Sequence, residues 1–136
     1  MSDKAVSGPE LKTTLTGLGL TPKWFAGHLN ISMRTVVRWL DQERIPEYAA
    51  KELELIYSIT HTEMIDVLTR GWSSGVLQTF RRNSDVTSDH ALAEYSLPAS
   101  WHRALTFRAV EQLRSSGRKN VTVDYWTAVN PQGESA

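Results

Sequence analysis

Apolar and polar residues recur with helical spacing between Thr21 and Leu40, and this pattern is interrupted once. Thr21 is suited to cap a helix because its hydroxyl can accept a hydrogen bond from a first-turn N–H, and Pro22 fits the first helical position. Asn30 tolerates the left-handed conformation that ends a helix, and Ser32 is suited to cap the next one. The stretch therefore predicts two short helices joined by a tight turn. Their apolar positions are Phe25, Ala26, Leu29, Val36, Trp39 and Leu40.

Helical patterns also precede and follow this stretch. Ser7 and Glu10 have the spacing of a capping box, which predicts a helix that runs to about Gly17. Later in the chain, apolar residues recur in steps of three and four, and we predict one long helix from Pro46 to about Arg70. A break near Thr60, where a new helix could be capped, is the alternative.

The second half of the chain mixes strand and helix patterns. Apolar side chains at Trp101, Leu105, Ala109 and Leu113 recur every four positions, which predicts a helix that Gly117 ends. Clean alternation after Asn120 predicts a strand. In chain order, we predict a loop at residues 71–75, a strand at 76–82, a polar segment at 83–88, a short helix at 89–95, a helix at 98–116 and a strand at 120–127.

These elements predict a mainly α protein with a small α+β part. Residues 1–58 are expected to form a four-helix head, which the long helix links to residues 59–130. Two strands alone are marginally stable in water, so the second half is expected to pair with a partner or to pack against the long helix. Residues 131–136 are expected to form a disordered tail.

Composition narrows the possible functions. The chain carries 15 Lys and Arg and 15 Asp and Glu, so its formal net charge is zero, whereas a purely electrostatic nucleic-acid binder would be basic. It contains no Cys, which excludes disulfides and thiolate metal sites. No apolar run approaches a membrane span, and the N-terminus lacks the apolar core of a secretion signal. We therefore expect a soluble, cytoplasmic protein without a membrane partner.

Positive charge is concentrated on the two short helices. Between Thr21 and Leu40 the cationic residues are Lys23, Arg34 and Arg38, and no acidic residue occurs. A solvated structural face usually mixes charges of both signs, so this pattern favours DNA binding. The alternative is a helical hairpin whose apolar residues only pack a core.

The stretch Leu11–Ile56 resembles the DNA-binding domain of the phage Cro/C-repressor-like helix-turn-helix proteins. The matched positions are Ala26, Asn30, Ile31, Ser32, Val36, Trp39 and Pro46. The resemblance implies that the segment 32–41 enters the DNA major groove as a recognition helix. The residues that it implies as base readers are Ser32, Met33, Arg34 and Arg38. Two positions depart from the family pattern, because the turn holds Asn30 where Gly is usual, and Pro22 stands where Gln is common.

Contacts to DNA phosphates are expected at the start of the first of these helices. Thr21 would cap a helix whose remaining N–H groups attract an anion. We predict that Lys23 and Arg44 lie beside this N-terminus and add two positive charges.

Dimerisation is assigned to the second half of the chain. Val121, Val123 and Tyr125 alternate onto one apolar face, and we predict that this face joins Trp101 and Leu105 in a homodimer interface. The order of repressor-like head, long helix, strand and helix also resembles the anti-CRISPR-associated autorepressors and the YdiL-type bacterial proteins. That resemblance implies an obligate homodimer.

The spacing and local charge predict DNA binding, and the resemblance implies the regulatory part: a sequence-specific transcriptional regulator, a dimeric repressor of its own or other genes that binds an inverted-repeat operator in double-stranded DNA without a cofactor. One alternative is an antitoxin whose C-terminal half binds a toxin as protein partner. Another is an excisionase-like architectural protein, although such chains are normally strongly basic. An enzyme is not expected, because the sequence has no recognisable cluster of acidic ligands or activated nucleophile.

No metal site is expected either. The four histidines have no other ligand type at a suitable spacing, so they are interpreted as surface or capping residues. They are His28, His61, His90 and His102.

Overall fold

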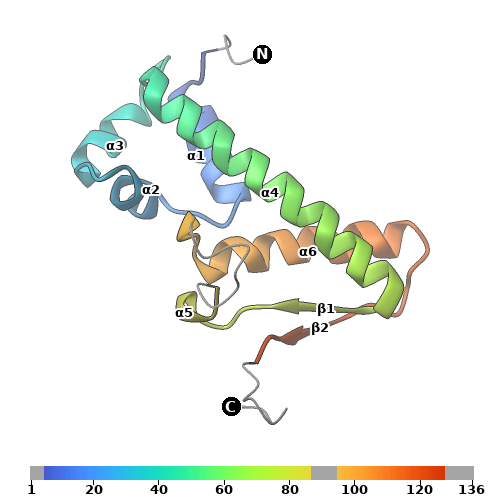
Figure 1. Cartoon of the computed structure of the whole chain (residues 1–136). Coiled ribbons are helices and arrows are strands. Elements are labelled where there is room, and N and C mark those ends of the chain that lie inside the picture. Colours follow the sequence, from blue (N-terminus) through green and yellow to red (C-terminus); the bar gives the residue numbers. More distant parts are fainter. Residues whose placement is uncertain (1–4, 87–94, 128–136) are drawn as a thin grey trace. The chain divides into compact units, whose positions relative to one another are not determined.

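The computed structural model describes residues 5–86 and 95–127 of the 136-residue chain. These residues form six helices and one two-stranded sheet, so the mainly helical fold with a small strand-containing part is confirmed (Figure 1). The chain divides into two compact units, Met1–Thr62 and Glu63–Ala136. The long helix α4 (Glu47–Ser74) contributes residues to both units.

The first unit contains α1 (Gly8–Gly17), α2 (Pro22–Leu29), α3 (Met33–Trp39) and the beginning of α4. Its predicted caps are confirmed. Ser7 and Glu10 form a reciprocal capping box, and the hydroxyls of Thr21 and Ser32 accept from the N–H groups of the residues three positions later. Asn30 ends α2 in the left-handed region with φ 58°. Local chemistry therefore sets the ends of all three short helices.

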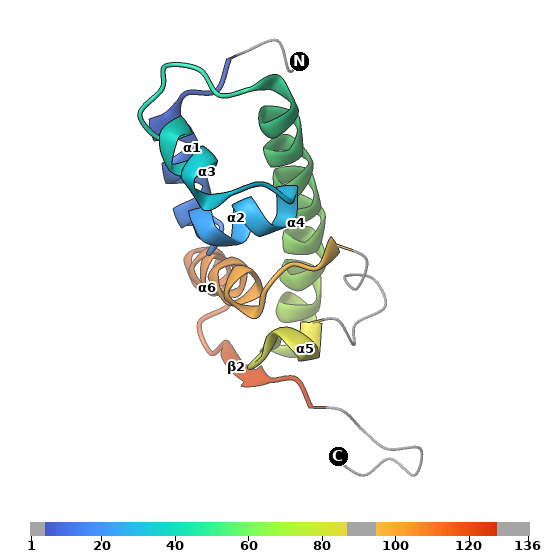
Figure 2. The ribbon, with the colours of Figure 1, turned by 90° about the vertical axis from the view of Figure 1, so that its left-hand side faces the viewer.

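α1, α2 and α3 lie on the same side of the first half of α4 (Figures 1 and 2). Their apolar faces make the core of the unit. The buried side chains are Leu11, Leu15, Leu18, Leu20, Phe25, Ala26, Val36, Trp39, Ile45, Ala49, Leu53 and Ile56.

Gly8 allows α1 to start directly against the end of α3. Its N–H donates to the carbonyl oxygen of Gln42 at 2.8 Å. A Cβ at this position would overlap the carbonyl oxygens of Trp39 and Leu40. Because these obstacles are backbone atoms, a side chain at position 8 has no flexible neighbour to displace.

α4 is one helix without a break at Thr60. The Thr60 hydroxyl donates to the carbonyl oxygen of Ile56 at 2.7 Å, so it is satisfied inside the helix. The predicted loop at 71–75 is wrong for its first four residues, because the helix continues through Gly71 to Ser74. A Cβ on Gly71 would lie 2.7 Å from Leu113 Cδ1, so the glycine permits a close helix contact. Gly75, with φ 75°, follows the helix in the left-handed conformation.

The second unit contains the end of α4 together with β1 (Val76–Thr79), α5 (Asn83–Val86), α6 (Ala99–Ser115) and β2 (Thr122–Tyr125). β1 and β2 pair in parallel, with Val76 opposite Thr122 and Thr79 opposite Tyr125. α6 lies in the connection between the two strands, so this part is a β-α-β arrangement. The strand predicted at 76–82 is confirmed for its first four residues, and the strand predicted at 120–127 is confirmed in its central part. The predicted helix at 89–95, except for Tyr95, and the predicted tail lie outside the described residues.

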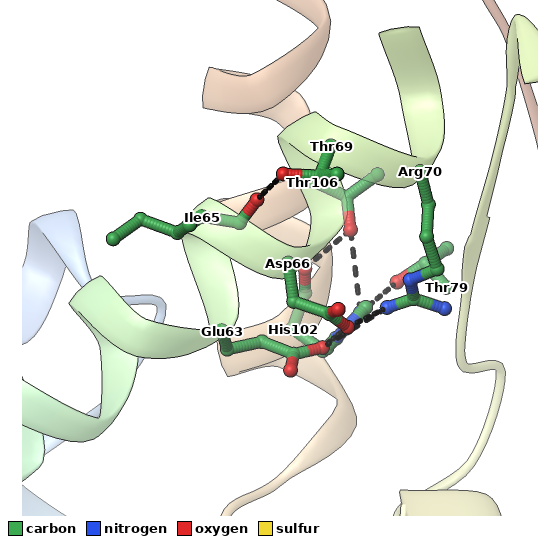
Figure 3. Close-up of polar contacts among 8 residues, drawn as sticks. All are labelled: Glu63, Ile65, Asp66, Thr69, Arg70, Thr79, His102 and Thr106. Carbon is green, nitrogen blue, oxygen red and sulfur yellow. Dashed lines mark hydrogen bonds and ion pairs between the residues drawn. The ribbon is translucent and has the colours of Figure 1, made fainter. Parts of the chain in front are cut away.

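A polar cluster lies within the second unit around His102 on α6 (Figure 3). His102 is 1% exposed. Its Nε2 lies 2.8 Å from Glu63 Oε2, and its Nδ1 lies 3.0 Å from Thr79 Oγ1 and 3.2 Å from Thr106 Oγ1. A carboxylate only accepts, so Nε2–H donates to Glu63. The cluster thus connects α4, β1 and α6 by hydrogen bonds inside the core.

We predict that Gly8→Ala destabilises the first unit by about 1–3 kcal/mol, because the added methyl group has to move backbone atoms. Gly17→Ala is the matched control, since a Cβ on that helical glycine meets nothing within 4 Å. The control should be neutral or stabilising by roughly 0.5–1 kcal/mol. Amide hydrogen exchange in α1 to α3 measures both changes. Equal protection in the two variants would show that the backbone at the end of α3 leaves room for a side chain at position 8.

We predict that Glu63→Ala destabilises the second unit by about 1–3 kcal/mol, because it leaves the buried Nε2–H of His102 without an acceptor. Glu63→Gln keeps an oxygen acceptor and should lose less. Asp66→Ala is the control, because Asp66 forms an exposed ion pair with Arg70 at 2.7 Å. Hydrogen exchange of the α6 amides reports the difference. A control as damaging as Glu63→Ala would refute the role given to Glu63 as the acceptor for His102.

Candidate nucleic-acid interface

The orientation of α3 is set by its cap and by two buried side chains. The Ser32 hydroxyl accepts from the N–H of Thr35 at 3.2 Å, which fixes the first turn. Val36 and Trp39 point into the core, and the Trp39 ring meets Tyr48 of α4 edge-on with centroids 5.8 Å apart. The opposite side of α3 is therefore exposed. It carries Met33, Arg34, Val37 and Arg38.

The two arginines on this face are available to a ligand. The side chains of Arg34 and Arg38 are exposed, and within the described residues neither guanidinium takes part in a hydrogen bond or ion pair. They lie one helical turn apart, so their guanidinium groups project from the same side. An unpaired guanidinium presents a planar fork of donors that matches the acceptor edge of guanine or a phosphate.

Val37 belongs to the exposed face, and the sequence prediction missed it. Met33 is 42% exposed and Val37 is 47% exposed. An apolar side chain held at the surface beside arginines can contact the methyl group of thymine. The signal that could have found Val37 is its spacing of four from the predicted reader Met33. Ser32, the remaining predicted reader, is exposed at the N-terminus of α3.

The N-terminus of α2 offers less to an anion than the sequence predicts. The Thr21 hydroxyl already accepts from the N–H of Trp24 at 3.0 Å. Pro22 has no N–H. The N–H of Lys23 is therefore the donor of this turn that remains for a phosphate, and the Lys23 side chain is exposed beside it.

Arg44 is not brought to this N-terminus by any described contact. It is exposed in the segment before α4, where it lines a surface hollow. The hollow has a volume of about 610 Å³ and is lined by side chains from the N-terminal segment, α1 and α4. No described contact joins Arg44 to Lys23 or to the start of α2, so their shared phosphate site stays a prediction.

α2 is held against α4 by a short hydrogen bond between His28 and Glu52, and the His28 ring also stacks on Trp24 of the same helix. The rings of Trp24 and His28 stack with centroids 4.7 Å apart and an interplanar angle of 15°. His28 Nε2 then lies 2.6 Å from Glu52 Oε2. His28 is thus a half-buried contact between helices rather than a surface residue. This contact fixes α2, against which α3 packs.

The histidine prediction is also wrong for His102, which is buried in the polar cluster of the second unit. His61 is exposed as predicted, and His90 lies outside the described residues. Among residues 5–86 and 95–127, no three His, Asp or Glu side chains are grouped as metal ligands.

The predicted dimerisation residues fall into two groups. Trp101 and Leu105 are completely buried in the second unit, and Val121 is 2% exposed, so these three are core residues and cannot form a surface. Val123 and Tyr125 on β2 are 44% and 45% exposed. The three strand residues therefore do not share one exposed face, and the predicted helix stripe packs inward because α6 lies against β1.

Within the described part of the chain, no helix combines the length and hydrophobicity that crossing a membrane requires. No protein-family model matches this sequence, and a search of the curated proteins finds no match to it. The resemblance to Cro/C-repressor-like proteins therefore rests on the residues named above.

Proposed function

We propose that this protein is a sequence-specific DNA-binding transcriptional regulator, a repressor that binds an inverted-repeat operator as a homodimer. The observation that supports this most directly is the exposed face of α3. It places two unpaired arginines beside two exposed apolar side chains, on a helix positioned by its Ser32 cap and by its buried residues Val36 and Trp39.

The composition of this face is that of a base reader rather than a general binder of polyanions. A protein with zero net charge gains little non-specific affinity from its overall field. Arg34 and Arg38 can each donate two hydrogen bonds to a guanine, and Met33 and Val37 can pack on thymine methyl groups. The proposed operator half-site therefore combines guanine with thymine.

A homodimer follows from the size of the interface. One recognition helix reads only a few base pairs, which is too few to identify a site in a genome. Two copies on a two-fold axis would read two half-sites in opposite orientation, about one helical turn of DNA apart.

We predict that Arg34→Ala and Arg38→Ala each weaken binding to the preferred duplex by about 5- to 150-fold, which corresponds to roughly 1–3 kcal/mol per bidentate contact. The preferred duplex is selected from a randomised library with the wild-type protein, and binding is measured by fluorescence anisotropy. Each variant should also lose preference at one base position of every half-site.

Lys51→Ala is the control for the arginine variants, because it removes one positive charge from α4, where Lys51 pairs with Glu47 at 3.3 Å. It should retain the base preference. Full binding by both arginine variants would rule out the proposed docking of α3.

We predict that Lys23→Ala weakens binding to every duplex alike and lowers the slope of log affinity against log salt by about one, as expected for one lost phosphate contact. Lys12→Ala on α1 is the control, since Lys12 is exposed and lies outside α2 and α3. Affinity for selected and random duplexes, measured across a salt series, distinguishes the Lys23→Ala variant from the Lys12→Ala control. An altered base preference with an unchanged slope would contradict the phosphate role.

A further inference from the structure

The outer edge of β2 is a candidate for pairing with another strand. Thr122 donates to Gly75 at 3.0 Å and Trp126 donates to Thr79 at 2.8 Å, so alternate residues of β2 turn their backbone groups toward β1. Between them, Val123 and Tyr125 turn their N–H and C=O groups to the opposite edge. The sheet of the described structure has two strands, so no third strand pairs with this edge there.

The sheet is also covered unequally by α6. α6 packs on β1, and Leu77 and Thr79 are buried. Their partners in the register, Val123 and Tyr125, share the same face of the sheet but are nearly half exposed. Beside them, Phe107 on α6 is 65% exposed. These side chains line a groove of about 440 Å³ between α6 and β2.

The groove carries charges of both signs. Arg103 and Arg114 line it together with Glu111 and Asp124. Both arginines donate to backbone carbonyl oxygens of their own unit, at 2.8 Å to Phe80 and 3.2 Å to Val121. Within the described residues, neither acidic side chain takes part in an ion pair. A two-fold contact requires a surface that complements itself, and mixed charge around an apolar centre meets that requirement.

We propose that a second copy of this chain occupies the groove, with the two β2 strands paired antiparallel across a two-fold axis. The result is a four-stranded sheet in the order β1, β2, β2, β1, with both α6 helices on one face. Phe107 of each copy then covers Val123 and Tyr125 of the other. This inference rests on the proposed function, which needs a dimer, and it specifies the interface.

The register of the pairing follows from symmetry and charge. Opposite residues in an antiparallel pair both face the partner or both face away, so the two-fold axis passes through a residue pair of equal number. An axis at Asp124 would place two carboxylates directly opposite each other, which is destabilising. An axis at Val123 instead places Asp124 opposite Thr122, and Tyr125 opposite Val121. An axis at Tyr125 would place Asp124 and Val123 opposite residues beyond the end of β2. We therefore assign the axis to Val123.

The first experiment is sedimentation equilibrium of the full chain without DNA. The wild type should be a dimer at micromolar concentration, and Phe107→Glu should weaken the dimer by at least about tenfold, because it buries a charge in the interface. Ile65→Glu is the matched control, since Ile65 on α4 is 53% exposed and does not line the groove. A monomeric wild type would overturn the proposal and leave the groove to residues 128–136 or to a different protein. An undiminished dimer in Phe107→Glu would move the interface elsewhere.

The second experiment tests the register, using the absence of Cys from the natural chain. Val123→Cys should form a disulfide-linked dimer under mild oxidation, because opposite residues of an antiparallel pair have Cα atoms within bridging distance. Val76→Cys places an exposed thiol on β1 and should remain uncrosslinked. Equal crosslinking of both variants would refute the paired β2 edges.

The same variants separate this proposal from the proposed function. A dimer that Phe107→Glu disrupts, in a protein that selects no duplex from the library, would support the interface and refute DNA reading. Selective DNA binding that Phe107→Glu leaves unchanged would support DNA reading and refute this interface.

Discussion

The burial of Val36 and Trp39 is the constraint on which the proposed reading surface depends. Successive residues of an α-helix are rotated by about 100°, so Arg34 and Arg38 fall roughly 160–200° away from Val36. Turning α3 to hide the arginines would expose both core side chains, which costs about 1.5–3 kcal/mol for each. The Ser32 cap fixes the residue at which α3 begins, and therefore the position of each later side chain around the helix. The outward face of α3 is thus determined by residues that cannot themselves contact DNA.

The second unit shows how a small β-α-β arrangement obtains its stability. A two-stranded sheet alone is marginal, so β1 depends on the layers above it. Gly71 allows α4 to approach α6 and β1, and the hydrogen bonds of His102 tie the same three elements together. The Gly71 contact and the His102 hydrogen bonds both involve β1, and neither involves β2. The exposed strand is therefore the expected result of building the core around one strand of the pair.

The sequence predicts those features that local chemistry determines. The capping side chains at Ser7, Thr21 and Ser32, and the left-handed Asn30, act on residues within one turn, so their patterns could be read directly. Gly71 was misread as a loop because the contact that offsets its low helix propensity comes from Leu113, far along the chain. The burial of His102 and Trp101 also depends on residues far along the chain, and so does the parallel pairing of β1 with β2. The local sequence pattern therefore does not predict these features. Val37 lies four positions from Met33 on the same face of α3, so helical spacing alone could have identified it.

DNA binding by the proposed dimer should depend steeply on protein concentration. One head contributes only Lys23, Arg34 and Arg38 as cations on α2 and α3, so a single copy should hold DNA weakly. When two copies are joined, the second head binds at the effective concentration set by the first, and affinity increases without any new contact to DNA. If the paired β2 edges dissociate in the concentration range found in the cell, operator occupancy rises with the square of monomer concentration. A repressor of its own gene would then respond steeply to its own accumulation, and the strength of the β2 contact, rather than that of α3 for DNA, would set the threshold.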